Sequence, residues 1–146
     1  MRVDFYFNVE DRLQYACRWV RKARAADKTV LVYARDAARL ARIDAALWLF
    51  SALDFLPHVY ADSPLAEDTP VLLTLDAHAA PARDLFLNLD DAVPPDFARL
   101  AARHERLIEI VGRDDHDRAL ARARFRAYRE AGFAPHPFDV ARQEAI

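Results

Sequence analysis

The sequence predicts one α/β domain spanning residues 1–146, with helices on both faces of a mostly parallel sheet. Short apolar runs of strand length alternate with longer segments whose apolar residues recur at helical spacing. No repeat, low-complexity stretch or internal linker interrupts this alternation. With 53% hydrophobic and 30% charged residues, the chain has the composition of a single compact domain. We therefore expect a three-layer α/β/α architecture.

The chain opens with a strand followed by a long helix. Residues 3–9, VDFYFNV, are apolar and aromatic over the length of a strand. Asp11 then starts a helical pattern that ends near Lys28. The residues predicted to form the inner face of this helix are Leu13, Ala16, Cys17, Val20 and Ala23.

A second strand and helix follow. Residues 29–34, TVLVYA, form a β-branched and apolar run of the kind that is buried on both faces of a parallel sheet. Asp36 is the predicted N-cap of the next helix. The apolar stripe of this helix consists of Leu40, Ile43, Leu47 and Phe50.

The second half of the chain continues the alternation. Three short strands separated by proline-containing loops are predicted at 57–62, 71–77 and 84–91. A short helix at 94–104, a strand at 106–112 and a last helix at 114–132 come next. The tail, residues 134–146, contains two prolines and is expected to run over the surface.

Composition excludes several classes of protein. The net charge of -2 gives no overall positive field, so any site for an anion must be local. A single cysteine, Cys17, excludes an intrachain disulfide and a cysteine-rich zinc motif. The N-terminus lacks a long apolar run, so we expect a cytoplasmic protein without a membrane span. With only Gly112 and Gly132, the Rossmann-like fold cannot carry a glycine-rich nucleotide motif, so no cofactor is expected.

The last helix carries a basic row. Arg118, Arg122, Arg126 and Arg129 follow one another at spacings of four, four and three residues, which places them on one helical face. Phe125 and Tyr128 lie beside this row, whereas Arg124 lies apart from it. An ordinary solvated face that complements the helix dipole would explain arginines late in a helix. The absence of acids between 118 and 129 and the flanking rings favour an anion-binding face instead.

The segment LWLFSALDFLPH, residues 47–58, has more apolar residues than one inner stripe can use. Trp48 and Phe55 therefore need a further partner. They either pack under a loop or stand exposed as anchors of an interface, and the sequence leaves both alternatives open.

Signals for catalysis are weak. The sequence DDHD at 114–117 resembles a set of metal ligands, but its place at a helix start favours capping and dipole interactions. No serine is flanked by glycines as in a nucleophile elbow. We expect no catalytic residue and no bound metal.

Two motifs together resemble the chi subunit of bacterial DNA polymerase III. They are RIDAALWLFSALDFLPHVYA, residues 42–61, and LARARFRAYREAGF, residues 120–133. The start VDFYF and the spacing of the elements agree, so the resemblance covers nearly the whole chain. It implies a non-catalytic accessory subunit of the replicase that binds the acidic C-terminal tail of single-stranded DNA-binding protein. Through a second subunit, psi, it would join the clamp loader.

The resemblance also implies site residues. The tail site maps to Val111, Arg122, Phe125, Arg126, Tyr128 and Arg129, and the psi side to Trp48 and Phe55. Where the family often has Tyr followed by Lys, this chain has Phe125 and Arg126, which keep the ring and the charge. The loop at 61–70 lacks the glycines of some relatives. The alternative function is direct binding of single-stranded nucleic acid by the same helix face.

Overall fold

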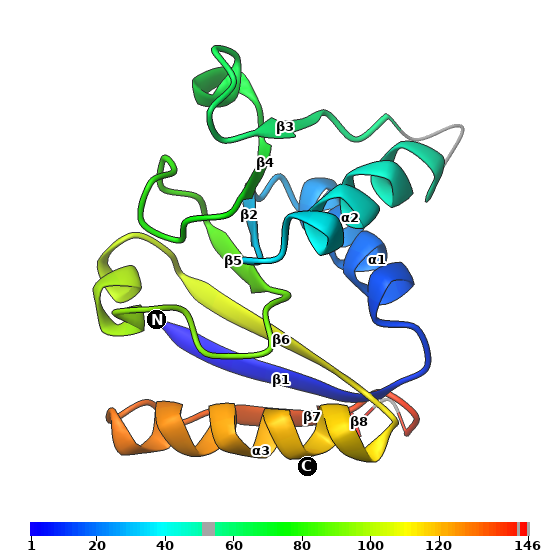
Figure 1. The fold of residues 1–146 in the computed structure, drawn as a ribbon, viewed down its shortest axis with the longest axis vertical. Helices are drawn as coiled ribbons and strands as arrows, with labels where there is room; N and C mark the ends of the chain where they lie inside the picture. The colour runs from blue at the N-terminus through cyan, green and yellow to red at the C-terminus, as the bar shows by residue number, and fades with distance from the viewer. Residues whose placement is uncertain (51–54, 143, 146) are drawn as a thin grey trace.

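The computed structural model describes residues 1–50, 55–142, 144 and 145. Three long helices and eight strands are defined among them, together with two short 3-10 helices (Figure 1). In chain order the elements are β1 (Arg2–Val9), α1 (Arg12–Ala25), β2 (Val30–Tyr33), α2 (Ala37–Phe50), β3 (His58–Tyr60), η1 (Ala66–Asp68), β4 (Val71–Thr74), β5 (Leu85–Asn88), η2 (Phe97–Ala102), β6 (Arg106–Gly112), α3 (Asp115–Glu130), β7 (His136–Asp139) and β8 (Glu144–Ala145).

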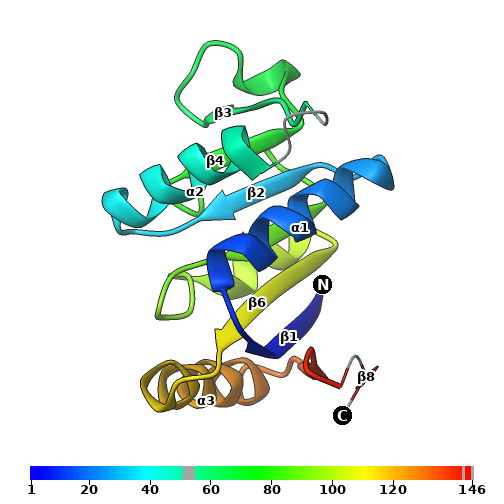
Figure 2. The same cartoon turned by 90° about the vertical axis from the view of Figure 1, so that its right-hand side faces the viewer.

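The strands form one sheet in the order β3-β4-β2-β5-β6-β1-β7-β8. Neighbouring strands are parallel except for β7 and β8, which are antiparallel. Helices α1 and α2 cover one face, and α3 lies against the other face near β6 and β1 (Figures 1 and 2). This arrangement confirms the predicted three-layer α/β fold with a mostly parallel sheet.

Aspartates start the three long helices where the sequence places them. The backbone N–H of Gln14 donates to Asp11, that of Ala38 to Asp36, and that of Asp117 to Asp114. Each carboxylate thus satisfies an amide that lacks a partner within its helix and lies at the positive end of the helix dipole. The acidic DDHD sequence is therefore accounted for by helix capping.

Alternating residues of the buried strands belong to two separate hydrophobic cores, one on each face of the sheet. Val30 and Val32 of β2 point toward α1 and α2, whereas Leu31 and Tyr33 point toward the η2 and α3 side. Strand β1 follows the same rule, since Val3 and Phe5 belong to the α3 side. The apolar runs of the sequence are buried on both faces because helices cover both faces.

Two segments differ from the sequence-based expectation. The short helix expected at 94–104 is the 3-10 helix η2, which begins only at Phe97. Residues 134–146 were expected to run over the surface, and the sequence did not predict that His136–Asp139 within them form strand β7, parallel to β1. Pro135 and Pro137 suggested a loop in this segment rather than a strand. Pro137 is compatible with this strand because β7 lies near the edge of the sheet, where a missing N–H is tolerated.

Candidate partner-binding surfaces

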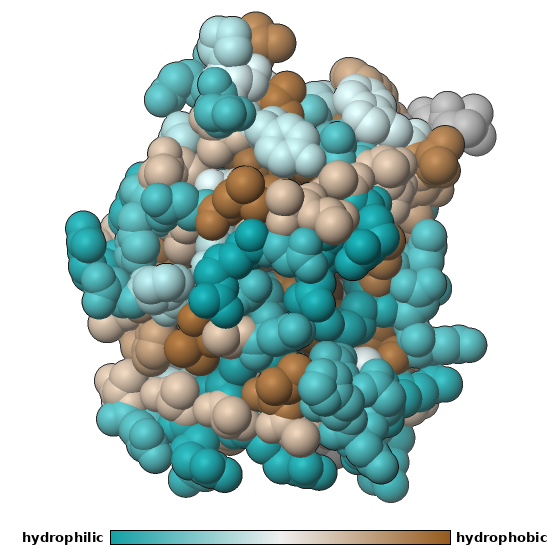
Figure 3. All heavy atoms as spheres, in the orientation of Figure 1, coloured by the Kyte–Doolittle hydropathy of each residue, from teal (hydrophilic) through white to brown (hydrophobic). Residues whose placement is uncertain are grey.

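Helix α3 exposes an unpaired basic row. The outer face of the helix presents Arg118, Arg122, Arg126 and Arg129 to solvent. Among the residues that the structure describes, no ion pair joins these four arginines to a carboxylate. Hydrophilic side chains line the lower edge of the molecule, where α3 lies (Figure 3). The predicted alignment of the row is therefore present, and its charges are available to a ligand.

An apolar pocket of about 210 Å³ opens beside this row. It lies where α3 crosses β1, β6 and β7, and Arg118 and Arg122 stand at its rim. The ring centroids of Phe5 and Phe125 are 5.0 Å apart in its wall. Its apolar lining consists of Phe5, Phe7, Val111, Ala121, Phe125 and Pro137.

A shallower hollow continues along the helix. It is lined by Arg122, Phe125, Arg126, Arg129 and Glu130 and has a volume of about 530 Å³. Phe125 and Arg122 belong to both depressions. Guanidinium groups bind carboxylates, and the pocket beside them can take an apolar group of the same ligand. The geometry suits an acidic chain that carries an apolar side chain.

Tyr128 does not belong to this surface, which corrects the sequence-based assignment. Its side chain is fully buried, and its hydroxyl donates to Oε2 of Glu109 at 2.6 Å. Burial, followed by the charge of Glu109, raises the pKa of Tyr128 well above its usual value. Tyr128 is thus a neutral buried donor and makes no contact with a ligand on the outer face.

Arg124 has a structural role beneath α3 that the sequence did not indicate. Only 2% of it is exposed, and its Nε donates to Oε1 of Glu109 at 3.0 Å. Its Nη1 also donates to the carbonyl oxygen of Asp91 at 2.9 Å. Burial opposes its charge, but Glu109 together with Tyr128 and Asp117 offsets this effect, so the pKa of Arg124 is raised. The pair fixes the rotation of α3 on the sheet and thereby directs the basic row outward.

Beyond α3, three residues of the pocket were not assigned to the site from the sequence. Arg118 belongs to the basic row, while Phe5, Phe7 and Pro137 come from β1 and β7. The alternation of VDFYFNV places Phe5 and Phe7 on one face of a strand. Only the pairing of β7 with β1, which depends on the tertiary fold, brings Pro137 beside them.

A second surface lies at the end of α2. Trp48 is 54% exposed and Phe55 is 74% exposed, and their ring centroids are 6.1 Å apart. Leu49 adjoins Trp48 in the chain and is 83% exposed. Residues 51–54 of the predicted segment lie outside the described residues. Between the alternatives left open by the sequence, the structure favours exposure of both rings.

A buried histidine supports this aromatic pair. The ring of His58 lies 4.4 Å from that of Trp48, measured between centroids. Its Nδ1 is 2.7 Å from the carbonyl oxygen of Leu56, and its Nε2 is 3.0 Å from the carboxylate of Asp44. These two contacts hold the imidazole between α2 and the start of β3, directly beside Trp48.

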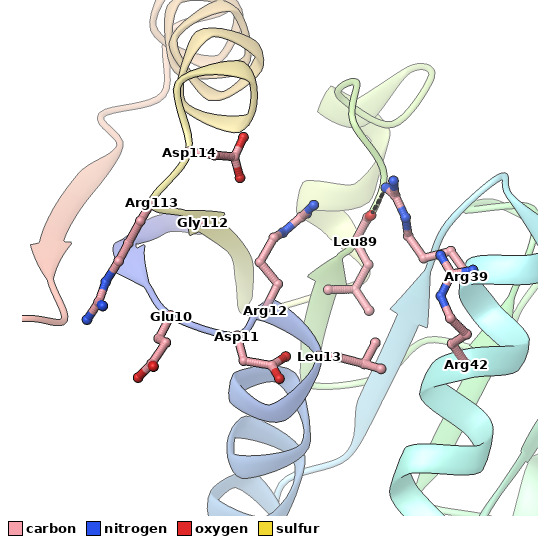
Figure 4. A pocket seen from close by; sticks show the side chains of 10 residues that line it. All are labelled: Glu10, Asp11, Arg12, Leu13, Arg39, Arg42, Leu89, Gly112, Arg113 and Asp114. Carbon is pink, nitrogen blue, oxygen red and sulfur yellow. Dashed lines mark hydrogen bonds between the residues drawn. The ribbon is translucent and has the colours of Figure 1, made fainter.

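A further cavity of about 860 Å³ lies at the carboxyl ends of β1 and β6 (Figure 4). Ligands of open α/β sheets commonly bind at such an edge. Here Arg39 donates to the carbonyl oxygen of Leu89 and to Asp91, and Arg12 donates to Asp117. The chain's own carbonyl and carboxylate groups therefore already engage these two arginines.

Asp117 also occupies the place where a phosphate would meet the backbone. It accepts a hydrogen bond from the N–H of Gly112 at 2.6 Å. A Cβ atom at Gly112 would lie 2.9 Å from this carboxylate, so a larger residue there would displace the side chain of Asp117. Among the described residues, no group of three or more potential metal ligands is present, and none of the helices is long and apolar enough to span a membrane.

Comparison with known proteins gives one consistent result. A family model described as DNA polymerase III chi subunit, HolC, matches residues 1–136. The DNA polymerase III subunit chi of Pseudomonas aeruginosa is 35% identical over 139 residues, covering 90% of this chain and 92% of that protein. The corresponding subunit of Escherichia coli K12 is 30% identical over 121 residues, covering 82% and 80%. That of Haemophilus influenzae is 27% identical over 121 residues, covering 82% and 81%.

Proposed function

The chain belongs to the DNA polymerase III chi subunit family, and we propose that it is a non-catalytic accessory subunit that binds the acidic C-terminal tail of single-stranded DNA-binding protein. One observation carries this proposal, namely the apolar pocket between Phe5, Val111 and Phe125 at the foot of an unpaired arginine row. The protein would act in the cytoplasm as part of the bacterial replisome.

The proposed tail would occupy both depressions on α3. Its aspartates bind Arg122, Arg126 and Arg129 in the shallow hollow, and its terminal apolar ring enters the pocket. A cavity of roughly 150 Å³ is enough to hold a benzene ring. The pocket volume of about 210 Å³ is therefore sufficient for one phenyl group.

The expected affinity is moderate. Two or three charge-assisted hydrogen bonds of about 1.5 to 3 kcal/mol each and one buried ring of about 2 to 3 kcal/mol give a gross sum of about 5 to 12 kcal/mol. The entropic cost of association offsets much of this sum. A dissociation constant in the micromolar range follows, which allows release during replication.

A labelled tail peptide titrated against the purified protein tests this function. Arg126→Glu reverses one charge of the exposed row, and we expect it to weaken binding by about tenfold or more. Arg42→Glu is the matched control, since it reverses an exposed charge on α2, which covers the opposite face of the sheet from α3. Equal binding by the wild type and by Arg126→Glu would remove the basis for the proposal.

The aromatic surface is the proposed link to the clamp loader. Trp48 and Phe55 would anchor the psi subunit because large exposed rings commonly dominate the binding energy of protein interfaces. The two surfaces use different elements: the tail site lies on α3 with β1, β6 and β7, and the aromatic surface lies at the end of α2. The protein could therefore bind psi and the tail together.

The alternative function, direct binding of single-stranded nucleic acid by the α3 face, has weaker support. Stacking of bases requires exposed rings beside the cations. With Tyr128 buried, Phe125 is the half-buried ring that remains from the predicted pair. Titration of the same variants with labelled oligo-dT separates this function from tail binding.

A further inference from the structure

Helix α1 carries a second cationic face that the proposed function does not use. Arg18, Arg21 and Lys22 are exposed, and no carboxylate occurs in the helix between Asp11 and Asp27. Among the residues described, no ion pair joins these three side chains to an acid. The chain as a whole has 21 basic and 23 acidic residues, so a face of this kind is a local concentration of positive charge.

Half-buried rings lie next to this face, between α1 and the edge of the sheet. Tyr6 of β1 stacks on Phe138 of β7, with centroids 5.1 Å apart and an interplanar angle of 12°. Tyr6 also contacts Tyr15 and Trp19 of α1 at centroid distances of 6.0 and 5.1 Å. In Figure 2, which views this side, no helix lies in front of β1. Tyr6, Tyr15 and Phe138 are half-buried, whereas Trp19 beneath them is buried, so three of these rings are partly open on the side of α1.

Further cations border the rings. The guanidinium of Arg106 lies over Trp19 at 5.1 Å, and the ammonium of Lys22 lies over the same ring at 5.5 Å. Arg2 is 5.9 Å from the ring of Phe138. Arg2 and Arg106 share the buried carboxylate of Asp4, so two positive charges face one negative charge. Even with this acid counted, the border remains positive.

The acids nearest to this face are already engaged or lie at its end. Glu105 binds Lys28 at 3.2 Å, and Asp27 lies 3.8 Å from Arg24 at the end of the helix. Neither is paired with Arg18, Arg21 or Lys22. Lys22 lies next to the rings, whereas the guanidinium of Arg21 lies 4.8 Å from the ring of Phe50 on α2. The cations thus extend from α2 to the rings, and an anionic chain with flat apolar groups complements both parts.

We propose that the α1 face, defined by Arg18, Arg21, Lys22, Tyr6 and Tyr15, binds single-stranded nucleic acid. Phosphates contact the three cations, and bases stack against the exposed parts of the rings. Duplex DNA fits less well because its bases are stacked within the helix and present no face to a ring. An acidic peptide would use the cations but leave the rings without a partner.

This surface is independent of the proposed tail site. Successive residues of β7 point to opposite faces of the sheet, so Pro137 lines the tail pocket while Phe138 lies among the rings on the α1 side. A tail on one face therefore leaves the other face open. The inference goes beyond the proposed function and does not require it.

Fluorescently labelled oligo-dT tests the proposal by titration at several salt concentrations. Three phosphate contacts predict a slope of about -2 in a plot of log affinity against log salt concentration. The variant Arg18→Ala/Arg21→Ala/Lys22→Ala should lose about tenfold or more in affinity at low salt, and its slope should approach zero. Because all three side chains are exposed, circular dichroism should show an unchanged fold.

A variant with equal loss of charge on the other face is the matched control. Arg122→Ala/Arg126→Ala/Arg129→Ala should bind oligo-dT nearly as well as the wild type and should lose the tail peptide. The α1 variant should show the reverse. Loss of oligo-dT binding in the α3 variant alone, or no binding by the wild type at low salt, overturns the proposal.

Stacking gives a second readout. In a Trp48→Phe background Trp19 is the sole tryptophan; it is buried, but it contacts the half-buried ring of Tyr6, so oligo-dT stacked on Tyr6 should change its fluorescence. An acidic peptide of equal charge should compete poorly with oligo-dT. If that peptide binds more tightly and Tyr15→Leu has no effect on oligo-dT, the surface is a site for an acidic protein and the proposal is wrong.

Discussion

Arg124 of α3 and Glu109 of β6 form a buried ion pair, with 3.0 Å between Nε and Oε1 and side-chain exposures of 2% and 0%. Glu109 also accepts hydrogen bonds from Tyr128 and Asn88. Four polar side chains are thereby connected beneath the helix that carries the proposed tail site, although Nη2 of Arg124 has no hydrogen-bond partner among the described residues. The orientation of the basic row depends on this buried contact, although neither residue of the pair reaches the surface.

Removal of the buried cation should be strongly destabilising. Arg124→Ala leaves the carboxylate of Glu109 buried without its counter-charge, and breaking such a pair typically costs about 3 to 5 kcal/mol. Arg122→Ala, two residues away on the exposed face, should change the free energy of unfolding by about 0.5 kcal/mol or less. Urea denaturation of both variants measures the difference. A loss of under about 1 kcal/mol in Arg124→Ala would contradict this role.

The sequence predicts features that depend on local interactions. Capping by Asp11, Asp36 and Asp114 was predictable because each carboxylate serves amides within three residues. The alignment of the basic row follows likewise from helical spacing. The role of Arg124 could not be read in this way, since a charged residue in a basic helix is usually exposed. Its partner lies 15 residues away in the chain, on a strand where Glu109 interrupts an apolar run.

The burial of Tyr128 and the pairing of β7 also depend on tertiary contacts that the local sequence does not show. A helical wheel gives the angle between side chains but not the stripe that faces the sheet. The buried stripe includes Ala121, Arg124 and Tyr128. This stripe is more polar than the side of the helix that carries Ala123, Ala127 and Ala131. Pairing of β7 with β1 is likewise a tertiary contact between distant segments, and the prolines of β7 obscure it in the sequence.

The thiol of Cys17 should be unreactive in the folded protein. It is fully buried, and burial, with a smaller effect of Asp11, raises its pKa to about 11. At pH 8 about one thiol in a thousand is then ionised, and the thiolate is the reactive form. Labelling with a disulfide reagent should be very slow in buffer and complete in denaturing urea. Rapid stoichiometric labelling of the native protein would show that α1 opens more readily than its packing indicates.

Stability should decrease in mildly acidic solution because of His104. Its Nδ1 lies 2.7 Å from the carbonyl oxygen of Arg83, and its Nε2 is buried without a hydrogen-bond partner among the described residues. Burial lowers the pKa of His104, so the fold favours the neutral ring. The unfolded chain binds a proton near pH 6.5. The contribution of the neutral ring is therefore complete above this pH and is lost as the pH falls toward the lower pKa of the folded state.

Denaturation of the wild type and of His104→Gln at pH 7.5 and 5.5 tests this effect. One proton accounts for at most about 1.4 kcal/mol per pH unit. The variant should lose less stability between the two pH values than the wild type does, whatever its stability at pH 7.5. An identical loss in both proteins would assign the acid sensitivity to other groups.

Phe55→Ala should weaken binding of psi without weakening the fold. The ring is 74% exposed, so its removal leaves no cavity in a core. An anchor residue of an interface typically contributes about 2 kcal/mol or more, which corresponds to a loss of affinity of about thirtyfold. Leu65→Ala, which removes another exposed apolar side chain, is the control. Calorimetric titration with purified psi should separate the two variants, and equal affinities would place the interface elsewhere.

The pocket beside α3 can be filled without altering any arginine. Ala121 lines the pocket and is 7% exposed, so the larger side chain of Ala121→Leu should occupy the space proposed for the terminal ring of the tail. We expect the affinity for the tail peptide to fall by about tenfold or more, since burial of a ring contributes about 2 to 3 kcal/mol. The salt dependence should remain, because the arginine row is intact. Ala123→Leu, an exposed position on the same helix, should bind like the wild type.

A peptide whose terminal ring is replaced by alanine gives a further test. It should bind Ala121→Leu and Ala123→Leu with equally weak affinity, because filling the pocket and removing the ring abolish the same contact. If the ring still contributes to binding by Ala121→Leu, the tail does not enter this pocket.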